Sequence, residues 1–350
     1  MSDAPGPPAA CLITGATGFI GGHVAERLAA QGHDVRCLVR PGSDTRRLVD
    51  LGATLCPGDL TDADSLAAAV RGCRYVVHCG AMVSDWALPE EIEAINVTGT
   101  RSLLAACAAA SVQRVVHISS TDVYGYPGEE AVEESRPPAG FANWYAQTKR
   151  AAETEVRRAE TGAGLDCVIL RPATVYGPGS TSVVGEMARA LRGRHMMLVG
   201  RGRTIAGLCY VENLVDAVEL ALSHAAASGE AFNITDGLTT TWREFLDDLA
   251  AGLGCPPVRW SLPYPAAIGL GFGLEHGYRR LRRATGFGVA PLLSRQAVHV
   301  LGRPQDFSNR KAAEVLGWRP RVGYAAALDA TLAWLRGEYL PSMERPAQTG

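Results

Sequence analysis

Two side chains that could form an acid–base pair, Tyr145 and Lys149, lie four residues apart in a segment of helical character. Residues at positions i and i+4 share one face of a helix, so the phenol and the ammonium group would be neighbours. A nearby cation stabilises the phenolate and lowers the pKa of a tyrosine from its usual value of about 10. The pair therefore predicts a tyrosine that exchanges a proton with a bound substrate near neutral pH.

A third candidate, Ser120, follows a short apolar run over residues 115–119 that is typical of a strand. A hydroxyl at the carboxyl end of a strand faces the ligand crevice of an open α/β sheet. We expect Ser120 to hydrogen-bond a substrate oxygen beside Tyr145. Alternatively, Ser120 only stabilises a turn. Thr121, the next residue, is the other candidate for the hydroxyl that contacts the substrate.

The segment TGATGFIG at residues 14–21 joins the first apolar run to a helix, with glycines at Gly15, Gly18 and Gly21. One such glycine permits a tight turn, the next lets the backbone approach a pyrophosphate, and the last lets helix pack on strand. The unpaired N–H groups of the helix N-terminus attract phosphate. The loop therefore predicts a dinucleotide site.

Arg40 stands at the predicted end of the second strand. An acidic residue there would accept hydrogen bonds from the ribose of NAD, whereas an arginine can pair with the 2′-phosphate of NADP. We therefore favour NADP(H), with Arg46 and Arg47 close by in sequence, and keep NAD(H) as the alternative. Asp59 either reaches the adenine or stabilises a turn.

These residues must be positioned by a regular alternation of short apolar runs and longer Ala-rich segments. The expected strands cover residues 11–14, 34–39, 54–56, 75–78, 115–119 and 167–170, and the expected helices 20–31, 62–71, 89–110 and 144–161. This alternation predicts an α/β fold, a doubly wound parallel (Rossmann) sheet with helices on both faces. Further on we expect helices within 181–200, 211–223 and 240–253, a strand over 231–235, and irregular structure over 256–305.

We expect a Rossmann dinucleotide-binding domain over residues 10–180 plus about 204–236. A smaller C-terminal α/β substrate-binding domain would then comprise about 181–203 and 237–340. Residues 1–9 and 341–350 are expected to be flexible tails.

Composition excludes several classes of protein. The 350 residues carry 34 basic and 36 acidic side chains, whereas a nucleic-acid binder should have a basic excess. No uncharged apolar run reaches the ~18–20 residues of a membrane span, and the first residues lack the pattern of a signal peptide. Nine scattered cysteines without CxxC pairs indicate reduced thiols rather than disulfides or a metal site. We therefore expect a bacterial, cytoplasmic protein.

The basic residues are almost all arginine, with Lys149 and Lys311 the two lysines of the sequence. An arginine at position 149 would keep the charge but present a wide planar fork in place of a compact ammonium group. Lys149 therefore has a chemical reason to be lysine.

Taken together, the motifs resemble the extended short-chain dehydrogenase/reductase family. The matching segments, in family order, are TGATGFIG (14–21), GDL (58–60), VVHCGA (76–81), NVTGT (96–100), SSTDVYG (119–125), YAQTK (145–149) and RPATVYGPG (171–179). The resemblance implies a catalytic triad of Ser120, Tyr145 and Lys149, with Asn96 in support, and a homodimer. It implies cofactor contacts from Gly15, Thr17, Gly18, Phe19, Ile20, Gly21, Arg40, Asp59, Leu60, Ala81, Tyr145, Lys149 and Pro172.

Within that family, the segments 231–250 and 290–320 look like the 3β-hydroxysteroid dehydrogenases and related bacterial ketone reductases. The segment VRCLVRPGSD at 35–44 resembles the dihydroflavonol-reductase-like branch, which is consistent with NADP. Neither likeness specifies a substrate.

The sequence departs from the nucleotide-sugar epimerases and dehydratases of the same family. Those enzymes typically carry Asn at the position of Thr174 and an arginine before the helix beginning near Val211, and both are absent. A sugar-nucleotide diphosphate would lose a charge-assisted hydrogen bond, unless Arg201 or Arg203 replaces it.

Residues 261–293 combine an apolar stretch with an arginine cluster at 279–283. The apolar stretch could line a pocket for a hydrophobic substrate, and the arginines could face an anionic tail or a lipid surface. An ordinary packed helix with a solvated end is the plainer interpretation. The candidate substrate contacts are Thr121, Thr174, Tyr210, Tyr264 and Phe272.

The sequence thus predicts an NAD(P)-dependent oxidoreductase that interconverts a secondary alcohol and a ketone on a hydrophobic, steroid-like or β-keto substrate. A nucleotide-sugar epimerase or dehydratase is the first alternative, and a non-catalytic cofactor-sensing protein on this fold is the second. We expect no metal, no nucleic acid and no membrane span, with peripheral membrane contact through 261–283 as an option.

Overall fold

The structure, a computed structural model, describes residues 9–84, 86–138, 143–285 and 293–344. Most of the expected tails, and part of the segment 261–293, therefore lie outside the described residues. Among the described helices, none is both long enough and apolar enough to cross a membrane.

Seven strands form the central sheet in the order β10-β6-β5-β4-β1-β2-β3, and every neighbouring pair is parallel. The strands are β1 (Ala10–Thr14), β2 (Asp34–Val39), β3 (Thr54–Pro57), β4 (Tyr75–His78), β5 (Arg114–Ile118), β6 (Cys167–Pro172) and β10 (Ala231–Ile234). The predicted doubly wound parallel sheet is confirmed.

The inner strands are apolar on both faces, as a sheet covered by helices on both sides requires. Ile13, Val77 and Val116 belong to the core on one face, and Val76 and Val115 belong to the core on the other. These consecutive apolar residues are the runs from which the strands were predicted.

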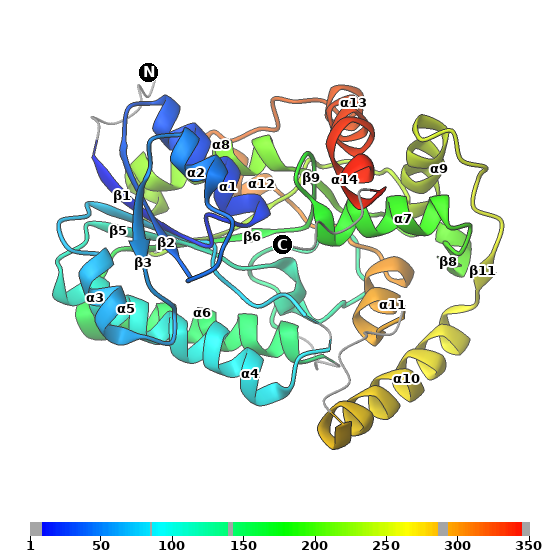
Figure 1. The fold of residues 1–350 in the computed structure, drawn as a ribbon, viewed down its shortest axis with the longest axis horizontal. Helices are drawn as coiled ribbons and strands as arrows, with labels where there is room; N and C mark the ends of the chain where they lie inside the picture. Colours follow the sequence, from blue (N-terminus) through cyan, green and yellow to red (C-terminus); the bar gives the residue numbers. More distant parts are fainter. Residues whose placement is uncertain (1–8, 85, 139–142, 286–292, 345–350) are drawn as a thin grey trace.

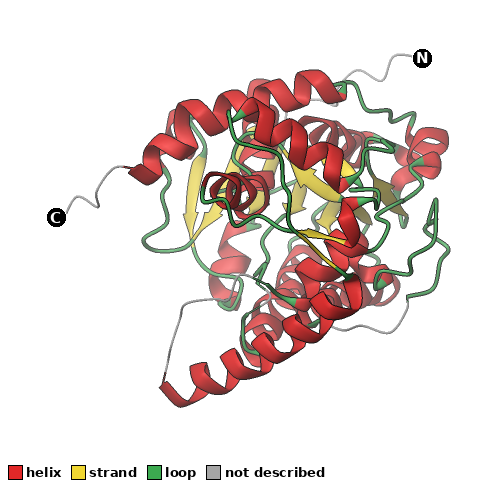
Figure 2. Ribbon diagram, turned by 90° about the vertical axis from the view of Figure 1, so that its right-hand side faces the viewer, coloured by secondary structure: helices red, strands yellow, loops and turns green. Residues whose placement is uncertain are grey.

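Helices cover both faces of this sheet (Figures 1 and 2). One layer contains α1 (Phe19–Ala30), α2 (Arg46–Asp50), α8 (Val211–Ser223), the short turn η5 (Ala225–Ala227) and α12 (Arg310–Leu316). The opposite layer contains α3 (Ala63–Ala69), α5 (Thr100–Ala109) and α6 (Trp144–Ala163).

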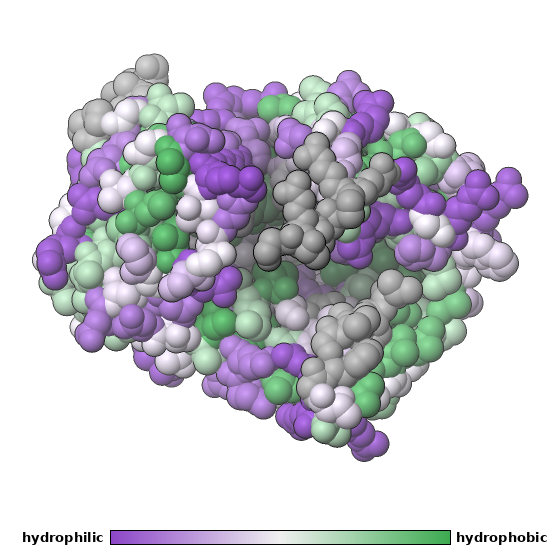
Figure 3. Space-filling model, in the orientation of Figure 1, coloured by the Kyte–Doolittle hydropathy of each residue, from purple (hydrophilic) through white to green (hydrophobic). Residues whose placement is uncertain are grey.

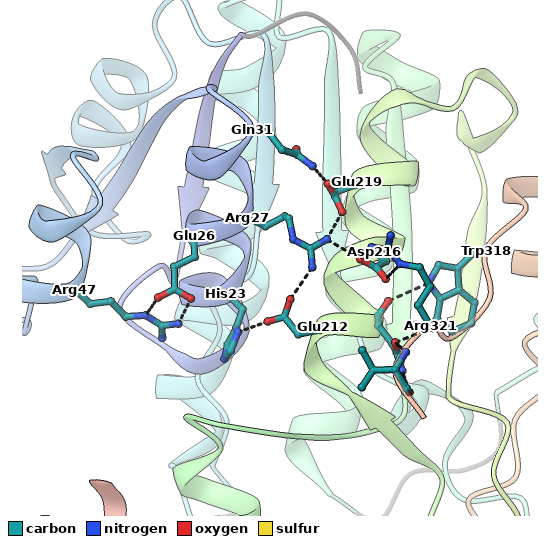
Figure 4. A network of polar contacts seen from close by, with 12 residues as sticks. His23, Glu26, Arg27, Gln31, Arg47, Glu212, Asp216, Glu219, Trp318 and Arg321 are labelled. Carbon is teal, nitrogen blue, oxygen red and sulfur yellow. Dashed lines mark hydrogen bonds and ion pairs between the residues drawn. The ribbon is translucent and has the colours of Figure 1, made fainter. Parts of the chain in front are cut away.

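A network of charged side chains joins α1 to α8 (Figure 4). Arg27 of α1 donates to Glu212 (2.7 Å) and Asp216 (2.6 Å), and Nδ1 of His23 is 2.7 Å from a Glu212 carboxylate oxygen. Arg321, beyond α12, pairs with the same Asp216. The helix that follows the glycine loop is therefore held in place by partners far away in the sequence.

The helix predicted over 89–110 is interrupted. It consists of α4 (Pro89–Glu93), the π-helical turn η1 (Ala94–Gly99) and α5. Within η1, Asn96 bonds the neighbouring loop rather than solvent, and Thr100 donates to the carbonyl oxygen of Asn96 (2.7 Å). Such π turns are often found at functional sites.

A second core lies beside the sheet and draws its residues from 176–340, with Tyr176, Trp242 and Phe245 fully buried. Its elements are β7 (Thr174–Tyr176), η3 (Thr181–Gly185), α7 (Glu186–Arg192), β8 (Leu198–Val199), η4 (Gly200–Gly202), β9 (Leu208–Tyr210), α9 (Trp242–Gly252), β11 (Ser261–Leu262), α13 (Tyr324–Trp334), η6 (Leu335–Tyr339) and α14 (Leu340–Glu344). Strand β7 pairs with β9, and β8 with β11. This second core supports the two-domain division, which we keep as a proposal.

The expectation of irregular structure over 256–305 was wrong. The segment contains α10 (Tyr264–Thr285) and α11 (Arg295–Gly302), which pack against each other. Pro265 falls in the first turn, where proline is tolerated. Gly271 permits close packing, since a Cβ there would lie 3.2 Å from the backbone nitrogen of Arg295. Tertiary contact thus overrides the weak helix propensity of a glycine-rich segment.

Candidate active site

The glycine loop after β1 is shaped so that larger residues would not fit. Gly15 has φ +71°, and a Cβ on it would lie 2.8 Å from the backbone of Gly80, beyond β4. A Cβ on Gly21 would collide with the carbonyl oxygen of Gly15. The loop lies between β1 and β4, where the strand order reverses, which is the ligand-binding crevice of an open α/β sheet.

The N-terminus of α1 is open to an anion. Gly18 caps the helix with no side-chain hydrogen bond, and the first turn holds no acidic residue. Thr17 and Gly18 are exposed, while Phe19 and Ile20 are half-buried. Unpaired N–H groups at such a terminus suit a pyrophosphate, so these residues fit a dinucleotide.

The residues predicted to bind the adenosine half of a dinucleotide, at the ends of β2 and β3, differ in exposure and in their partners. Arg40 is exposed, whereas Arg47 forms a salt bridge with Glu26. The pKa of Asp59 is lowered, chiefly by hydrogen bonds from Thr61 and in part by the charge of Arg40. Arg40 is therefore the more accessible of the two arginines.

Two more predicted cofactor residues, Leu60 and Pro172, are buried. Leu60 packs so closely on Gly99 that a Cβ there would lie 2.9 Å from the Leu60 Cβ. Pro172 ends β6, and Ala81 lies half-buried beyond the end of β4. All three stand toward the carboxyl edge of the sheet.

Ser120 follows β5 and caps the 3₁₀ turn η2 (Thr121–Tyr124), where its Oγ accepts a hydrogen bond from the backbone nitrogen of Asp122 (3.1 Å). Since the oxygen acts there as an acceptor, the hydroxyl proton can be donated to a substrate. The turn-stabilising role considered as an alternative is thus real, and it orients the hydroxyl. Thr121 is buried.

Tyr145 and Lys149 lie in the first turns of α6, which begins after Asn143; the side chain of Asn143 accepts from the nitrogen of Ala146 (2.7 Å). Lys149 is buried, and its Nζ donates to the carbonyl oxygen of Ile118 (2.6 Å), two residues before Ser120. This bond fixes the start of α6 against the strand end that carries Ser120. Tyr145 is half-buried.

Burial lowers the pKa of Lys149 to about 8, although the negative charges of Glu153 and Asp122 offset part of the effect. The same burial lowers the pKa of His78 to about 3 and that of His117 well below its usual range. Both imidazoles are therefore neutral near pH 7, and Lys149 is the cation beside them.

Asn96 connects three elements around these residues. Its Oδ1 accepts from the nitrogen of Met82 (2.7 Å), and its Nδ2 donates to the Met82 oxygen (3.0 Å) and to Thr148 Oγ1 (3.1 Å). The side chain is buried. Asn96 thus holds the loop after β4 against α6, one residue from Lys149.

Behind the lysine lies a hydrogen-bonded group that the sequence analysis did not identify. Glu153 accepts from Ser119 Oγ (2.6 Å) and from two nitrogens of Arg171 (2.9 and 2.7 Å). Arg171 also donates to the hydroxyl of Tyr124 (2.8 Å), which donates to Asn233 on β10 (2.7 Å). Two features of the sequence could have indicated this group. Glu153 lies one helical turn after Lys149, and Arg171 is the first residue of RPATVYGPG.

The turn that carries Ser120 also contacts α11, which the sequence analysis did not expect to be a helix. Gln296 donates to Asp122 (3.0 Å), and His299 stacks on Tyr126 with ring centroids 5.2 Å apart. Tyr264, one of the predicted substrate contacts, has its hydroxyl 2.8 Å from His299 Nδ1. These residues lie together next to the turn that carries Ser120.

The other predicted substrate contacts are dispersed. Thr174 is half-buried on β7, and Tyr210 is buried at the end of β9 against Tyr176. Phe272 is half exposed on a flank of α10, above Arg295. Between the sheet and the second core the molecular surface is hollowed (Figure 3).

Residues 11–235, over half of the chain, match the sequence model of one protein family, the NAD dependent epimerase/dehydratase family. The chain belongs to this family. It is an enzyme, an oxidoreductase of the extended short-chain dehydrogenase/reductase type.

Two curated relatives are similar over nearly the full length. One is 4-hydroxy-2-methyl-3-oxo-4-farnesyl-3,4-dihydroquinoline-1-oxide ketoreductase of Stigmatella aurantiaca, 32% identical over 91% of this chain and 94% of the relative. The other is 3 beta-hydroxysteroid dehydrogenase/Delta 5-->4-isomerase of Mycobacterium tuberculosis, 32% identical over 92% of this chain and 89% of the relative.

Among solved structures, UDP-glucose 4-epimerase of Thermus thermophilus in complex with NAD superposes with a TM-score of 0.72. It is 28% identical, and the match covers 94% of this chain and 99% of the epimerase. The fold is therefore shared by reductases and epimerases, and only the site can separate the two activities.

Proposed function

We propose that the protein reversibly reduces a ketone to a secondary alcohol on a hydrophobic, steroid-like or β-keto substrate. The observation that carries this proposal is the bond from Lys149 Nζ to Ile118, which holds the Tyr145 helix against the strand end bearing Ser120. Both lie at the carboxyl edge of the sheet, where the glycine loop also opens. These contacts support our assignment of Tyr145 as the proton donor, Lys149 as the cation and Ser120 as the orienting hydroxyl of one site.

In the reduction, Tyr145 donates its phenolic proton to the carbonyl oxygen, and Lys149 stabilises the phenolate that remains. Ser120 donates a hydrogen bond to the same carbonyl oxygen and orients it. A nicotinamide dinucleotide, when bound along the glycine loop, supplies the hydride. Asn96 positions α6 and the loop after β4 around the substrate.

We favour NADP(H) over NAD(H) as the cofactor of this reaction. The support is Arg40, an exposed cation at the end of β2 where acidic residues would select the ribose hydroxyls of NAD. Arg47 forms a salt bridge with Glu26, whereas Arg40 forms none with the described residues.

A nucleotide-sugar epimerase is the second candidate, and the match to the Thermus epimerase favours it. Against it stands the segment 204–210, which carries no arginine before the helix that begins at Val211, where the nucleotide-sugar enzymes typically have one. The Stigmatella relative, by contrast, is named as a ketoreductase.

The two candidates are separated by one experiment with purified protein. NADPH oxidation is followed with a panel of apolar ketones, and thermal shifts are recorded with UDP-glucose, steroids, NAD and NADP. We expect turnover of an apolar ketone that Tyr145→Phe abolishes while binding of NADPH is retained. A thermal shift with UDP-glucose and none with ketones would reverse the ranking.

We further propose that the enzyme is a homodimer, as the family resemblance implies, and that it works in the cytoplasm, as its scattered cysteines without CxxC pairs indicate. Light scattering of the purified protein tests the first statement, and fractionation of the source cells tests the second.

A further inference from the structure

The histidine at the end of β4, His78, is hydrogen-bonded at both nitrogens of its ring. Its Nδ1 is 2.7 Å from Thr14 Oγ1, and its Nε2 is 2.9 Å from Thr100 Oγ1. All three side chains are buried. Because Thr14 ends β1 and Thr100 begins α5, the ring of His78 joins three elements of the fold.

The direction of each hydrogen bond in this chain follows from the number of protons available. Thr100 donates its hydroxyl proton to the carbonyl oxygen of Asn96 (2.7 Å), so its oxygen must accept from His78 Nε2. Burial lowers the pKa of His78 to about 3, so the ring is neutral and carries one proton. Its Nδ1 is then an acceptor for the proton of Thr14, whose oxygen accepts from the backbone nitrogen of Gly80 (3.1 Å). Each of the four bonds therefore has one donor and one acceptor.

This chain of bonds runs from the glycine loop to the π turn η1. Thr14 directly precedes Gly15, and a Cβ on Gly15 would lie 2.8 Å from the backbone of Gly80, where the chain of bonds begins. It ends on the carbonyl oxygen of Asn96, whose side chain holds the loop after β4 against α6. The loop expected to bind the dinucleotide and the residue that supports the triad are thus connected through His78.

The π turn uses the hydroxyl of Thr100 where a regular helix uses a backbone nitrogen. In an α-helix the backbone nitrogen of Thr100 would bond to the carbonyl oxygen of Asn96, four residues earlier. In η1 that nitrogen bonds to Val97 instead, and the hydroxyl of Thr100 bonds to Asn96. The bond from His78 holds this hydroxyl in the orientation that the turn needs.

A second histidine shows that burial in this sheet does not by itself bring such bonds. His117 pairs with His78 across the strands β5 and β4, and their ring centroids are 5.2 Å apart. His117 is as buried as His78, yet neither of its ring nitrogens has a hydrogen-bond partner among the described residues. The bonds of His78 are therefore a property of its position and not of every buried histidine nearby.

We propose that His78 and Thr100 are positioning residues, which fix the π turn of Asn96 relative to the glycine loop and so hold α6 and the loop after β4 in place around the substrate. Without the hydroxyl of Thr100, the N–H of His78 is buried with no acceptor. Asn96 can then move together with Met82 and Thr148, to which it is bonded. The effect on turnover rests on the proposed function, whereas the effect on the turn itself does not.

The experiment compares two substitutions at one position in the purified full chain. Thr100→Val keeps the shape of the side chain and removes the hydroxyl, whereas Thr100→Ser keeps the hydroxyl and removes the methyl group. The matched control is Thr331→Val on α13, in the second core, because the hydroxyl of this buried threonine also donates to the carbonyl oxygen four residues earlier (Ala327, 2.6 Å). With 15N-labelled methionine, hydrogen exchange of the Met82 amide, which donates to Asn96 (2.7 Å), reports the state of the turn. The kcat of ketone reduction and the Kd of NADPH report the state of the site.

In Thr100→Val we expect the Met82 amide to exchange about tenfold faster than in the wild type, and kcat to fall about tenfold while the Kd of NADPH changes less than about threefold. Thr100→Ser and Thr331→Val should stay within about threefold of the wild type in every measurement. A role in packing alone would give the reverse order, with Thr100→Val tolerated and Thr100→Ser impaired.

The proposal would be overturned by unchanged Met82 exchange or unchanged kcat in Thr100→Val, or by equal losses in Thr100→Val and Thr100→Ser. Wild-type protein that reduces no ketone would contradict the proposed function alone, because the exchange of the Met82 amide still decides whether the hydroxyl of Thr100 holds the turn.

Discussion

The charge on Lys149 should depend on a carboxylate and a guanidinium that never touch the substrate. Glu153 lies one helical turn after Lys149 and is paired with Arg171, and both side chains are at most 14% exposed. At a separation of ~5 Å and an effective dielectric constant of ~20, a carboxylate stabilises an ammonium group by ~3 kcal/mol. Arg171 cancels part of this, so we take about half, close to one pKa unit.

Glu153→Gln should therefore lower the pKa of Lys149 by about one unit, from about 8 to about 7. A neutral lysine no longer stabilises the phenolate of Tyr145, so the alkaline limb of kcat/KM should move to lower pH by a similar amount. Arg171→Met removes the opposing charge, and the limb should move to higher pH. Opposite displacements from two variants of one ion pair are not expected from a general loss of structure.

The other titratable groups around Lys149 are unchanged in both variants. They are Asp122 on the turn after β5, Cys79 after β4, the neutral imidazoles of His78 and His117, and Tyr145 on α6. The matched control is Glu155→Gln, a carboxylate on the same helix that is also buried but pairs with Arg101. Its profile should coincide with that of the wild type. The reasoning would be refuted if the alkaline limbs of Glu153→Gln and Arg171→Met moved in the same direction. It would also be refuted if the alkaline limb of Glu155→Gln moved as far as that of Glu153→Gln.

Three further variants, and a fourth that serves as a control, test other parts of the protein. Lys149→Met should unfold at a higher urea concentration than the wild type at pH 7. The pKa of Lys149 is lower in the folded than in the unfolded chain, so its charge destabilises the fold by ~3 kcal/mol below pH 8, and this destabilisation disappears as the pH rises toward 10. Urea titrations of the variant and the wild type at pH 7 and pH 10 measure the difference in stability at each pH. Arg40→Glu should weaken NADPH binding by tenfold or more while leaving NADH binding within a few-fold, read by fluorescence titration; equal losses for the two cofactors would contradict the assignment. Gly15→Ala should abolish dinucleotide binding or folding, whereas Gly162→Ala, with open space at the Cβ position, should be neutral or stabilise by up to ~1 kcal/mol in thermal unfolding.

The nucleotide-binding half could be predicted closely from the sequence, because its signals are local. The strand predicted over 34–39 is confirmed at both ends, and the helix predicted over 211–223 begins and ends where expected. Buried parallel strands form apolar runs, and the glycines of a phosphate loop are required by backbone geometry. Each of these two properties can be recognised from a short continuous segment of the sequence.

What could not be predicted depends on contacts between distant residues. The π turn around Asn96 is stabilised through Met82 and Thr148, neither of which is in its own helix. Helix α10 buries one charged residue, Glu275, because that carboxylate pairs with Arg295 on α11. The group of Glu153 and Arg171 is assembled from α6 and β6, so no single segment of the sequence displays it.

The edge strand β10 has a consequence for how the chain folds during synthesis. It pairs with β6, yet the whole of α7, β8, β9 and α8 lies between them in the sequence. Until residues 231–234 leave the ribosome, β6 is an open edge with unpaired backbone groups, which is a template for aggregation. Helix α12 and Arg321 must follow later still to cover β10 and α8. A chain cut short before residue 231 should therefore require chaperones, although it contains every residue of the proposed triad.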